Sequence, residues 1–229
     1  MYITYKNGKE HELIYDDIAH TYKVNDVKIP SVTRIIDACF EKNLTNWAIS
    51  IGDVEYHRII SEALEIGNYT HKWIESFLLS ERFDCENTNP SIEAFLKWCK
   101  DYQPHFIDAE RKVYCDKYKY AGTVDAVAKI NGRVCVIDFK TSKKIYKPYH
   151  LQVTAYAQAI KRIDGLRQWP LGIILRLDKL TGEYEQKVFE PKDHMSTFIK
   201  CLELRQWSSL RIKNDKNKLE SKNESVSNR

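Results

Sequence analysis

Two acidic side chains and one lysine stand close together in a predicted pair of strands. Asp125 falls on the first strand, and Asp138 and Lys140 fall on the second, within the stretch 121–140. An Asn-Gly pair at 131–132 predicts the tight turn between the strands, because both central positions of a type I′ turn need positive φ. Side chains alternate along a strand, so Asp138 and Lys140 are expected to project from the same face.

This group of charges suits the binding of a hard cation beside a phosphate. Two carboxylates and an ammonium are costly to bury unless they pair with one another or hold a divalent metal. The same layout can stabilise charge on a phosphate as it is attacked. The alternative is an exposed hairpin with an ordinary salt bridge. The apolar residues Val134, Val136 and Ile137 favour an interior strand instead.

A helix predicted at 149–163 follows the break at Pro148. Gln152 and Tyr156 lie four residues apart and therefore share one face, which suits hydrogen bonding to and stacking on a nucleic-acid strand. The loop before the helix adds three cations that could follow a strand's backbone, Lys143, Lys144 and Lys147. The alternatives are an ordinary amphipathic helix and a solvated charged loop.

Together these elements resemble the PD-(D/E)xK nuclease superfamily and, within it, the RecB-like exonucleases, including phage and CRISPR-associated members. The matching motifs occur in the family's order. They are Gly67-Asn-Tyr-Thr-His71, Glu110, the GTVD run that ends at Asp125, Asp138-Phe-Lys140 and Gln152-x-x-x-Tyr156. Val124 replaces the proline of the family name, as is common in the RecB-like branch. The N-terminal stretch 14–36 also resembles the lead-in of phage nucleases of this kind.

The resemblance implies a role for each matching residue. Asp125 and Asp138 would be carboxylate ligands of a metal. The main-chain carbonyl of Phe139 would add an oxygen ligand, and His71 would add the nitrogen ligand. A mixed imidazole and carboxylate sphere suits Mn²⁺ as well as Mg²⁺. Lys140 would position or help to deprotonate the attacking water and offset charge on the phosphate.

Two of these residues are open to other interpretations. Glu110 begins a predicted strand at 110–117 and could hold a second metal or a water. His71 is flanked by Trp73 and Ile74, so a packed helical residue is the alternative to a ligand.

The expected activity is that of a metal-dependent DNA exonuclease of phage or mobile-element type, acting on single-stranded or end-containing DNA. A structure-specific endonuclease on the same core is one alternative. A catalytically silent nucleic-acid-binding accessory protein is the other, although the intact catalytic set argues against it. A recombination or replication protein is a candidate partner, and the oligomeric state stays open.

Composition and cysteine usage set the broad class. The 229 residues are 43% hydrophobic and 30% charged, as in a soluble globular protein, and the net charge of +4 is a weak indication of nucleic-acid binding. No apolar run reaches membrane-spanning length, and the N-terminus does not resemble a signal peptide, so a cytoplasmic location is expected. The six scattered cysteines favour reduced, mostly buried thiols. Related nucleases with an iron–sulfur cluster place three cysteines near the C-terminus. Only Cys201 lies there, so no cluster is expected.

Periodicity and turn signals predict the order of the elements. Short strands are expected in 1–29, then a helix from Val32 capped by Ser31, and helices over 44–80 punctuated by Gly52 and Gly67. Further helices are expected at Pro90–Tyr102 and 192–207. Strands are expected at 110–117, 123–130, 133–139, 171–177 and 183–189.

This order predicts an α/β fold with a restriction-endonuclease-like core, in which helices flank a central mixed β-sheet. Residues 1–105 would form N-terminal strands and a helical arch that supplies His71. Residues 106–210 would form the nuclease core, and 211–229 a polar, disordered tail.

Overall fold

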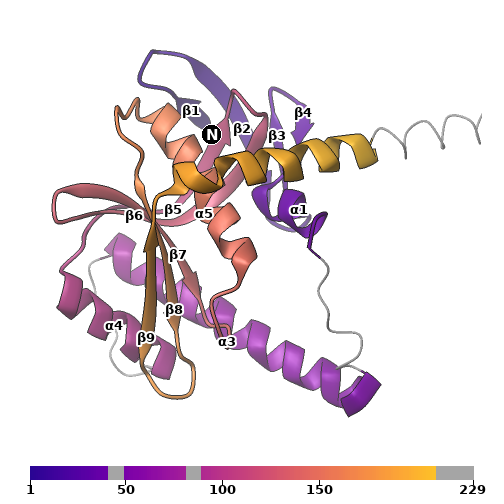
Figure 1. Cartoon of the computed structure of the whole chain (residues 1–229), viewed down its shortest axis with the longest axis vertical. Coiled ribbons are helices and arrows are strands. Elements are labelled where there is room, and N and C mark those ends of the chain that lie inside the picture. Colours follow the sequence, from indigo (N-terminus) through magenta and orange to yellow (C-terminus); the bar gives the residue numbers. More distant parts are fainter. Residues whose placement is uncertain (41–48, 81–88, 210–229) are drawn as a thin grey trace, which may run out of the picture.

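Two β-sheets organise the chain, and helices pack around them (Figure 1). The computed structural model describes residues 1–40, 49–80 and 89–209. The N-terminal sheet has the strand order β1-β2-β3-β4, and every neighbouring pair is antiparallel. Its strands are β1 (Tyr2–Thr4), β2 (Glu10–Asp16), β3 (Thr21–Val24) and β4 (Val27–Ile29).

The central sheet has five strands in the order β5-β6-β7-β8-β9. They are β5 (His105–Cys115), β6 (Tyr120–Ile130), β7 (Arg133–Lys140), β8 (Leu171–Leu177) and β9 (Tyr184–Phe189). The pair β7 and β8 is parallel, whereas the other neighbours are antiparallel. A parallel pair needs a crossover, which α5 (Lys147–Ile163) supplies. The predicted α/β class with a central mixed sheet is therefore confirmed, and it is consistent with a restriction-endonuclease-like core.

The turn between β6 and β7 has the predicted form. Asn131 and Gly132 have φ values of 49° and 77°, and Ile130 pairs with Arg133 across the turn. Two positive φ values in a two-residue loop match the right-handed twist of the strands. The turn thereby fixes the register that brings the two strands of the candidate site together.

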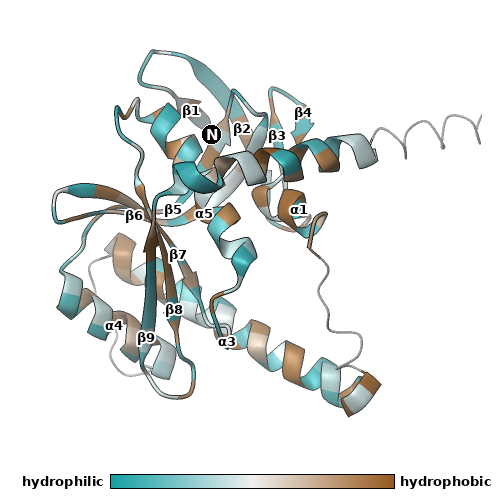
Figure 2. Ribbon diagram, viewed as in Figure 1, coloured by the Kyte–Doolittle hydropathy of each residue, from teal (hydrophilic) through white to brown (hydrophobic). Residues whose placement is uncertain are grey.

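Helices cover both faces of the central sheet. On one face, α3 (Asp53–Ser80) and α4 (Pro90–Tyr102) pack over apolar side chains such as Ile137 and Phe139. On the other face, α5 and a closing helix over 195–209 pack over residues such as Val136 and Ile174. Figure 2 shows that the inner strands of the central sheet are largely hydrophobic, whereas hydrophobic and hydrophilic residues alternate along the helices.

The helix α4 illustrates how local sequence produces the layer. Asn89 accepts a hydrogen bond from the Ile92 N–H at 3.0 Å, Pro90 begins the helix, and Gln103 ends it in a left-handed conformation. Phe95 and Trp98 face the sheet and are fully buried. Each side chain of this kind stabilises the fold by about 1.5–3 kcal/mol when it leaves water. The predicted helix at Pro90–Tyr102 is confirmed.

The N-terminal sheet shares an apolar core with the central sheet. The short helix α1 (Val32–Asp37) packs its buried Val32 and Ile35 into this core. Ser31 caps α1, as predicted, by accepting a hydrogen bond from the Arg34 N–H at 3.2 Å. The Tyr5 hydroxyl donates to the main-chain carbonyl of Tyr114, so the N-terminal strands are fixed directly to β5.

The predicted break at Gly67 is wrong, because α3 continues through it. A Cβ at Gly67 would lie 3.3 Å from Oγ1 of Thr141, so the glycine allows the chain after β7 to approach the helix closely. Gly52, with a φ of 82°, does precede the helix. The part of the prediction that covers 44–48 lies outside the described residues.

The other predicted elements are present, but several boundaries differ: β6 begins at Tyr120 rather than at residue 123, and α5 begins at Lys147 rather than at residue 149. The strand β5 begins at His105 rather than at residue 110, which places Glu110 in its interior. The 3₁₀ turn Pro191–His194 leads into the closing helix, close to the predicted 192–207. The predicted tail at 211–229 lies outside the described residues. None of the helices in the described ranges is long and apolar enough to cross a membrane.

Candidate metal centre and active site

Three side chains from three elements converge near the middle of the strands β5 and β6. His71 of α3, Glu110 of β5 and Asp125 of β6 each present one potential ligand atom, and these atoms lie within 4.8 Å of one another. The Nδ1 atom of His71 lies 3.7 Å from Oδ2 of Asp125. We call these three residues the metal cluster. All three are half-buried, which leaves them open to a small ligand.

The backbone at Glu110 is unusual and helps to aim its side chain. The register of β5 and β6 places Glu110 opposite Asp125, between the pairs Ala109–Ala126 and Arg111–Val124. Glu110 has a φ of 46°, in the left-handed region that non-glycine residues rarely adopt. Such a conformation costs about 1–3 kcal/mol and gathers at functional sites. The strand thus holds the glutamate against the neighbouring aspartate at an energetic cost.

A main-chain hydrogen bond fixes Asp125 to the neighbouring strand. The N–H of Phe139 donates to Oδ2 of Asp125 at 2.8 Å. The Phe139 ring packs toward α3 and α4, and its centroid lies 5.6 Å from that of Phe95 and 6.2 Å from that of His71. The alternation predicted for β7 is therefore confirmed, since Phe139 packs under α3 and α4 while Asp138 belongs to the opposite face.

Asp138 and Lys140 form a buried ion pair beside the metal cluster. The Lys140 Nζ atom lies 2.8 Å from Oδ2 of Asp138, whose side chain is 0% exposed. No hydrogen bond of good geometry reaches either Asp138 oxygen within the described part of the chain. Burial raises the pKa of Asp138 above its ordinary value. Burial alone would lower the Lys140 pKa, but the carboxylates of Asp138 and Asp125 outweigh it and hold that pKa high.

Asp138 is not one of the three residues whose ligand atoms meet. The negative charge of Asp125, a member of the metal cluster, helps to raise the pKa of Asp138. The direct partner of the Asp138 carboxylate is Lys140. The ligand set predicted from the sequence, with Asp138 and the Phe139 carbonyl included, stays a prediction. The sequence predicted that Glu110 could hold a second metal or a water. In the structure its carboxylate instead lies in the same group of potential ligands as His71 and Asp125.

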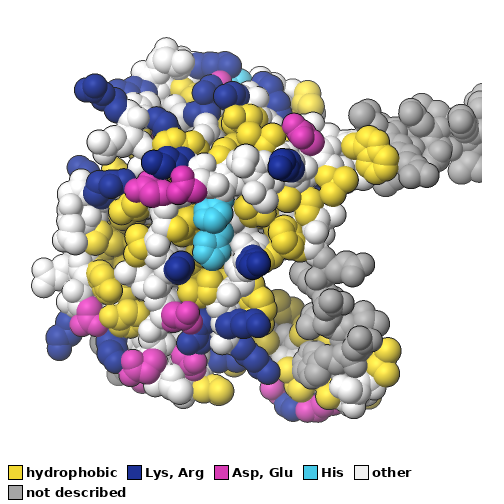
Figure 3. Space-filling view, in the orientation of Figure 1, with side chains coloured by type: hydrophobic (Ala, Val, Ile, Leu, Met, Phe, Trp, Pro, Cys, Tyr) yellow, Lys and Arg dark blue, Asp and Glu magenta, His cyan; other side chains and the backbone are white. Residues whose placement is uncertain are grey.

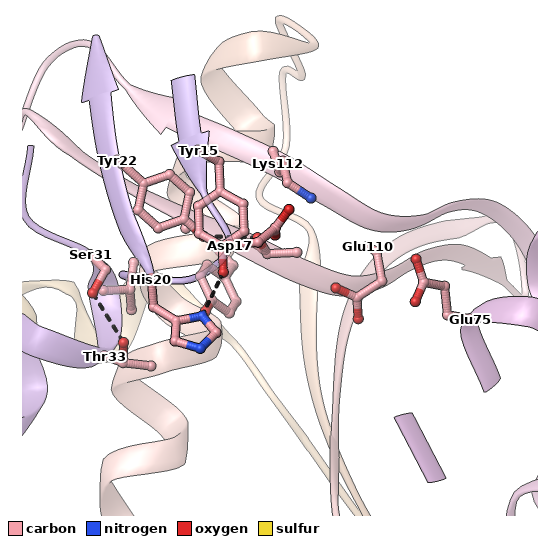
Figure 4. Close-up of a pocket in the computed structure, with 13 residues that line it drawn as sticks. Tyr15, Asp17, His20, Tyr22, Ser31, Thr33, Glu75, Glu110 and Lys112 are labelled. Carbon is pink, nitrogen blue, oxygen red and sulfur yellow. Dashed lines mark hydrogen bonds between the residues drawn. The ribbon is translucent and has the colours of Figure 1, made fainter. Parts of the chain in front are cut away.

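Glu75 is a further site residue, and it is absent from the set predicted from the sequence. Figure 4 shows its carboxylate facing that of Glu110. Burial, followed by the charges of Asp125 and Glu75, raises the pKa of Glu110 to about 7. Glu75 follows His71 by four residues on α3, so helical spacing places both on one face. That spacing is the signal that could have identified it.

The donor set fits a divalent cation. An imidazole nitrogen and carboxylate oxygens are ligands that Mg²⁺ and Mn²⁺ accept. The like charges that raise the Glu110 pKa would be offset by a cation held between His71, Glu110 and Asp125. The Asp138 carboxylate, which is paired with Lys140 through Oδ2, has a second oxygen that adds acceptor capacity beside them.

Gln152 and Tyr156 share a face of α5, as predicted, and Gln152 Nε2 donates to the Tyr156 hydroxyl at 3.3 Å. However, Tyr156 is only 4% exposed. A Cβ at Gly122, in the GTVD run, would lie 2.6 Å from Cε1 of Tyr156, so the glycine makes room for the ring. Stacking of Tyr156 on a base, as expected from the sequence, does not fit this packed ring. Its hydroxyl is the group that remains near the site.

The three predicted lysines lie around the start of α5. Lys143 and Lys144 are exposed in the loop after β7, and Lys147 is exposed in the first turn of the helix. The Lys144 Nζ atom lies 5.3 Å from the Tyr146 ring centroid. Their predicted role in nucleic-acid binding stays a prediction.

Comparisons with known proteins add a relationship to nucleases. The chain is 31% identical over 153 residues to mitochondrial genome maintenance exonuclease 1 of Mus musculus, and 31% identical over 152 residues to the protein of the same name of Homo sapiens. Each match covers 58% of this chain but 44% of the relative, so the chain matches less than half the length of these proteins. No family model matches. These similarities to proteins named as exonucleases support a nuclease relationship.

Among solved structures, the crystal structure of SSO0001 matches with a TM-score of 0.42 and 14% identity. The match covers 77% of this chain and 74% of that chain.

Proposed function

We propose that this chain is a metal-dependent deoxyribonuclease of the RecB-like branch of the PD-(D/E)xK superfamily, and that it works as an exonuclease. The observation that carries the proposal is the convergence of His71, Glu110 and Asp125 next to the buried Lys140–Asp138 pair. The relatives named as exonucleases support the same activity. The substrate would be single-stranded DNA or DNA with free ends, hydrolysed at its phosphodiester bonds.

In this proposal, different residues of the chain have different roles. His71, Glu110 and Asp125 would hold Mg²⁺ or Mn²⁺, with Asp138 as a further acceptor beside them. When bound, such a cation stabilises charge on a phosphate and acidifies a water. The Phe139 N–H keeps the Asp125 carboxylate in place through its hydrogen bond.

Lys140 would act on the substrate. Its ammonium stays protonated beside Asp138, so it can offset charge that develops on the phosphate and can orient a water by donating a hydrogen bond. Because Asp138 holds the ammonium at 2.8 Å, the lysine needs little reorganisation before it acts.

The experiment that tests the proposal compares linear and circular single-stranded DNA of the same sequence in Mn²⁺. An exonuclease degrades the linear strand to short products and leaves the circle intact. Cleavage of the circle would instead support an endonuclease on the same core. If purified protein binds both strands but degrades neither, a silent binding protein replaces the proposal. The Lys140→Ala variant serves as the matched control for contaminating nuclease.

A further inference from the structure

A cavity of about 420 Å³ beside the N-terminal sheet is lined by four cationic side chains. They come from β4, α1, the turn before β6 and the closing helix, and are Lys28, Arg34, Lys119 and Arg205. No acidic residue of the described ranges lines this cavity. We call it the basic cavity. Figure 3 shows Lys and Arg side chains gathered over the part of the molecule that holds β1–β4.

The four cations are not neutralised by the described parts of the protein. None of them forms an ion pair with a described acidic side chain. Arg34 donates only to the carbonyl of Ala19, at 3.5 Å, and the Lys119 Nζ atom lies 5.9 Å from the Tyr114 ring centroid. Like charges around one hollow repel each other. A polyanion that neutralises them would therefore be attracted to it.

A second cavity lies between the basic cavity and Glu110 of the metal cluster, and we call it the connecting cavity. Its volume is about 400 Å³, and its wall includes Glu110 and Tyr156 at the site end. His20 and Ser31 line both cavities, so the two hollows adjoin. Figure 4 shows the residues of this connecting cavity, from Glu110 and Glu75 on one side to Ser31 and Thr33 on the other.

The connecting cavity is lined by groups that can contact a nucleotide and also by three carboxylates, Asp17, Glu75 and Glu110, the last of which belongs to the metal cluster. The rings of Tyr15 and Tyr22 are stacked, with their centroids 4.7 Å apart. The Tyr15 hydroxyl lies 2.9 Å from Nδ1 of His20. The Lys112 Nζ atom lies 5.1 Å from the Tyr15 ring centroid. Hydroxyl, imidazole and ammonium groups suit a sugar and a phosphate, and aromatic rings accompany them in single-strand binding sites.

We propose that a single strand of DNA runs from the metal cluster through the connecting cavity to the basic cavity, where the four cations hold its phosphates. The proposal rests on the proposed function and names its substrate as a strand that extends beyond the reacting bond. The wall is built by β2, β3, β4 and α1, so the N-terminal sheet becomes part of the substrate-binding surface. The predicted lysines Lys143 and Lys144 line neither cavity.

The test measures binding, so that it does not depend on hydrolysis. One variant combines Lys28→Gln, Arg34→Gln, Lys119→Gln and Arg205→Gln. A matched control removes the same number of exposed cations away from both cavities, with Lys100→Gln, Lys129→Gln, Lys187→Gln and Lys192→Gln. The affinity for labelled single-stranded DNA is measured by anisotropy in Ca²⁺ over a range of salt concentrations.

The four-cation variant should show a flatter salt dependence. Each lost phosphate contact removes about 0.7 from the slope of log affinity against log salt for single strands, so the slope should fall by about 2–3. Affinity at low salt should fall at least tenfold, while the control variant should keep the parental slope. A parental slope in the four-cation variant overturns the proposed path. Loss of binding to duplex DNA alone overturns the single-strand assignment.

A second measurement keeps the proposal testable if the combined variant folds poorly. Single strands that carry 4-thiothymidine are cross-linked to the unmodified protein by light, and the modified peptides are identified. Cross-links to peptides with Thr33 or Gln206 support the path, whereas cross-links confined to the loop with Lys143 and Lys144 overturn it. Hydrolysis by the unmodified protein is assayed separately. A flatter slope without any hydrolysis would retain the path and reject the proposed function.

Discussion

The main-chain N–H of Phe139 donates a hydrogen bond to Oδ2 of Asp125 at 2.8 Å, and this bond joins the two strands of the candidate site. It leaves the charge of Asp125 available beside His71 and Glu110. This carboxylate thus combines an observed structural role with a proposed role as a metal ligand, and substitutions can separate the two.

Asp125→Asn should separate these roles. The asparagine oxygen can still accept the Phe139 N–H bond, so thermal stability should stay near the parental value while Mn²⁺ affinity falls. Asp125→Ala should lose metal affinity and also about 1–3 kcal/mol of stability, because the buried N–H loses its partner. Calorimetric metal titration and denaturant unfolding measure the two effects. Unchanged metal affinity in both variants would show that Asp125 is not a ligand.

Lys140→Ala should reduce the hydrolysis rate by about 10²–10⁴-fold, as expected for a group that acts in the chemical step. The metal-free variant should also lose about 3–5 kcal/mol of stability, because Asp138 is left buried without its partner. Adding Asp138→Asn should recover much of the stability but none of the rate. If the Lys140→Ala variant has the same free energy of unfolding as the parent, the ion pair contributes little to the stability of the fold.

His71→Ala should weaken metal binding at least tenfold with little loss of stability, because the His71 side chain is 32% exposed. Ile74, three residues further along α3 and 1% exposed, is the matched control. Ile74→Ala should cost about 2–5 kcal/mol of stability without a direct effect on the metal. Melting and metal titration on the same samples distinguish a ligand from a packed residue. The ligand assignment fails if His71→Ala loses stability and keeps metal affinity.

The attachment of the N-terminal sheet should depend on pH through Asp116. Burial alone would raise its pKa, but hydrogen bonds from Arg162 and Lys9 outweigh this and lower the pKa to about 2. Because the folded pKa lies below the unfolded value, the stabilisation is complete above about pH 4 and is lost as pH falls toward 2.

Asp116→Asn should therefore cost about 1–2 kcal/mol at pH 7, with the difference from the parent shrinking below pH 4. Glu183→Gln, which removes the partner of Lys97 in an exposed pair, should change stability little at any pH. Urea unfolding at several pH values measures both variants. A difference for Asp116→Asn that does not change with pH would contradict the assigned role.

Local signals in the sequence were sufficient for most elements. The Asn-Gly turn at 131–132, the cap at Ser31 and the helix Pro90–Tyr102 each depend on neighbouring residues, and each is confirmed. Gly67 misled the prediction, because the same residue type that interrupts helices also permits close packing. Only the tertiary structure shows Thr141 beside it.

Features that depend on distant contacts could not be predicted. The left-handed backbone at Glu110 and the approach of Tyr156 to Gly122 follow from how β5 and α5 meet β6. The basic cavity gathers residues from Lys28 to Arg205, far apart along the chain. Glu75 is an intermediate case, since its spacing from His71 was visible in the sequence but its facing partner Glu110 was not.

The most direct test of the account is the metal dependence of hydrolysis. A linear, end-labelled single strand is incubated with the protein in excess EDTA, and Mn²⁺ or Mg²⁺ is then added beyond the chelator. The account predicts no hydrolysis in EDTA, recovery on addition of either metal, and no recovery for Asp125→Asn or Glu110→Gln. Robust hydrolysis in excess EDTA by the unmodified protein would contradict it.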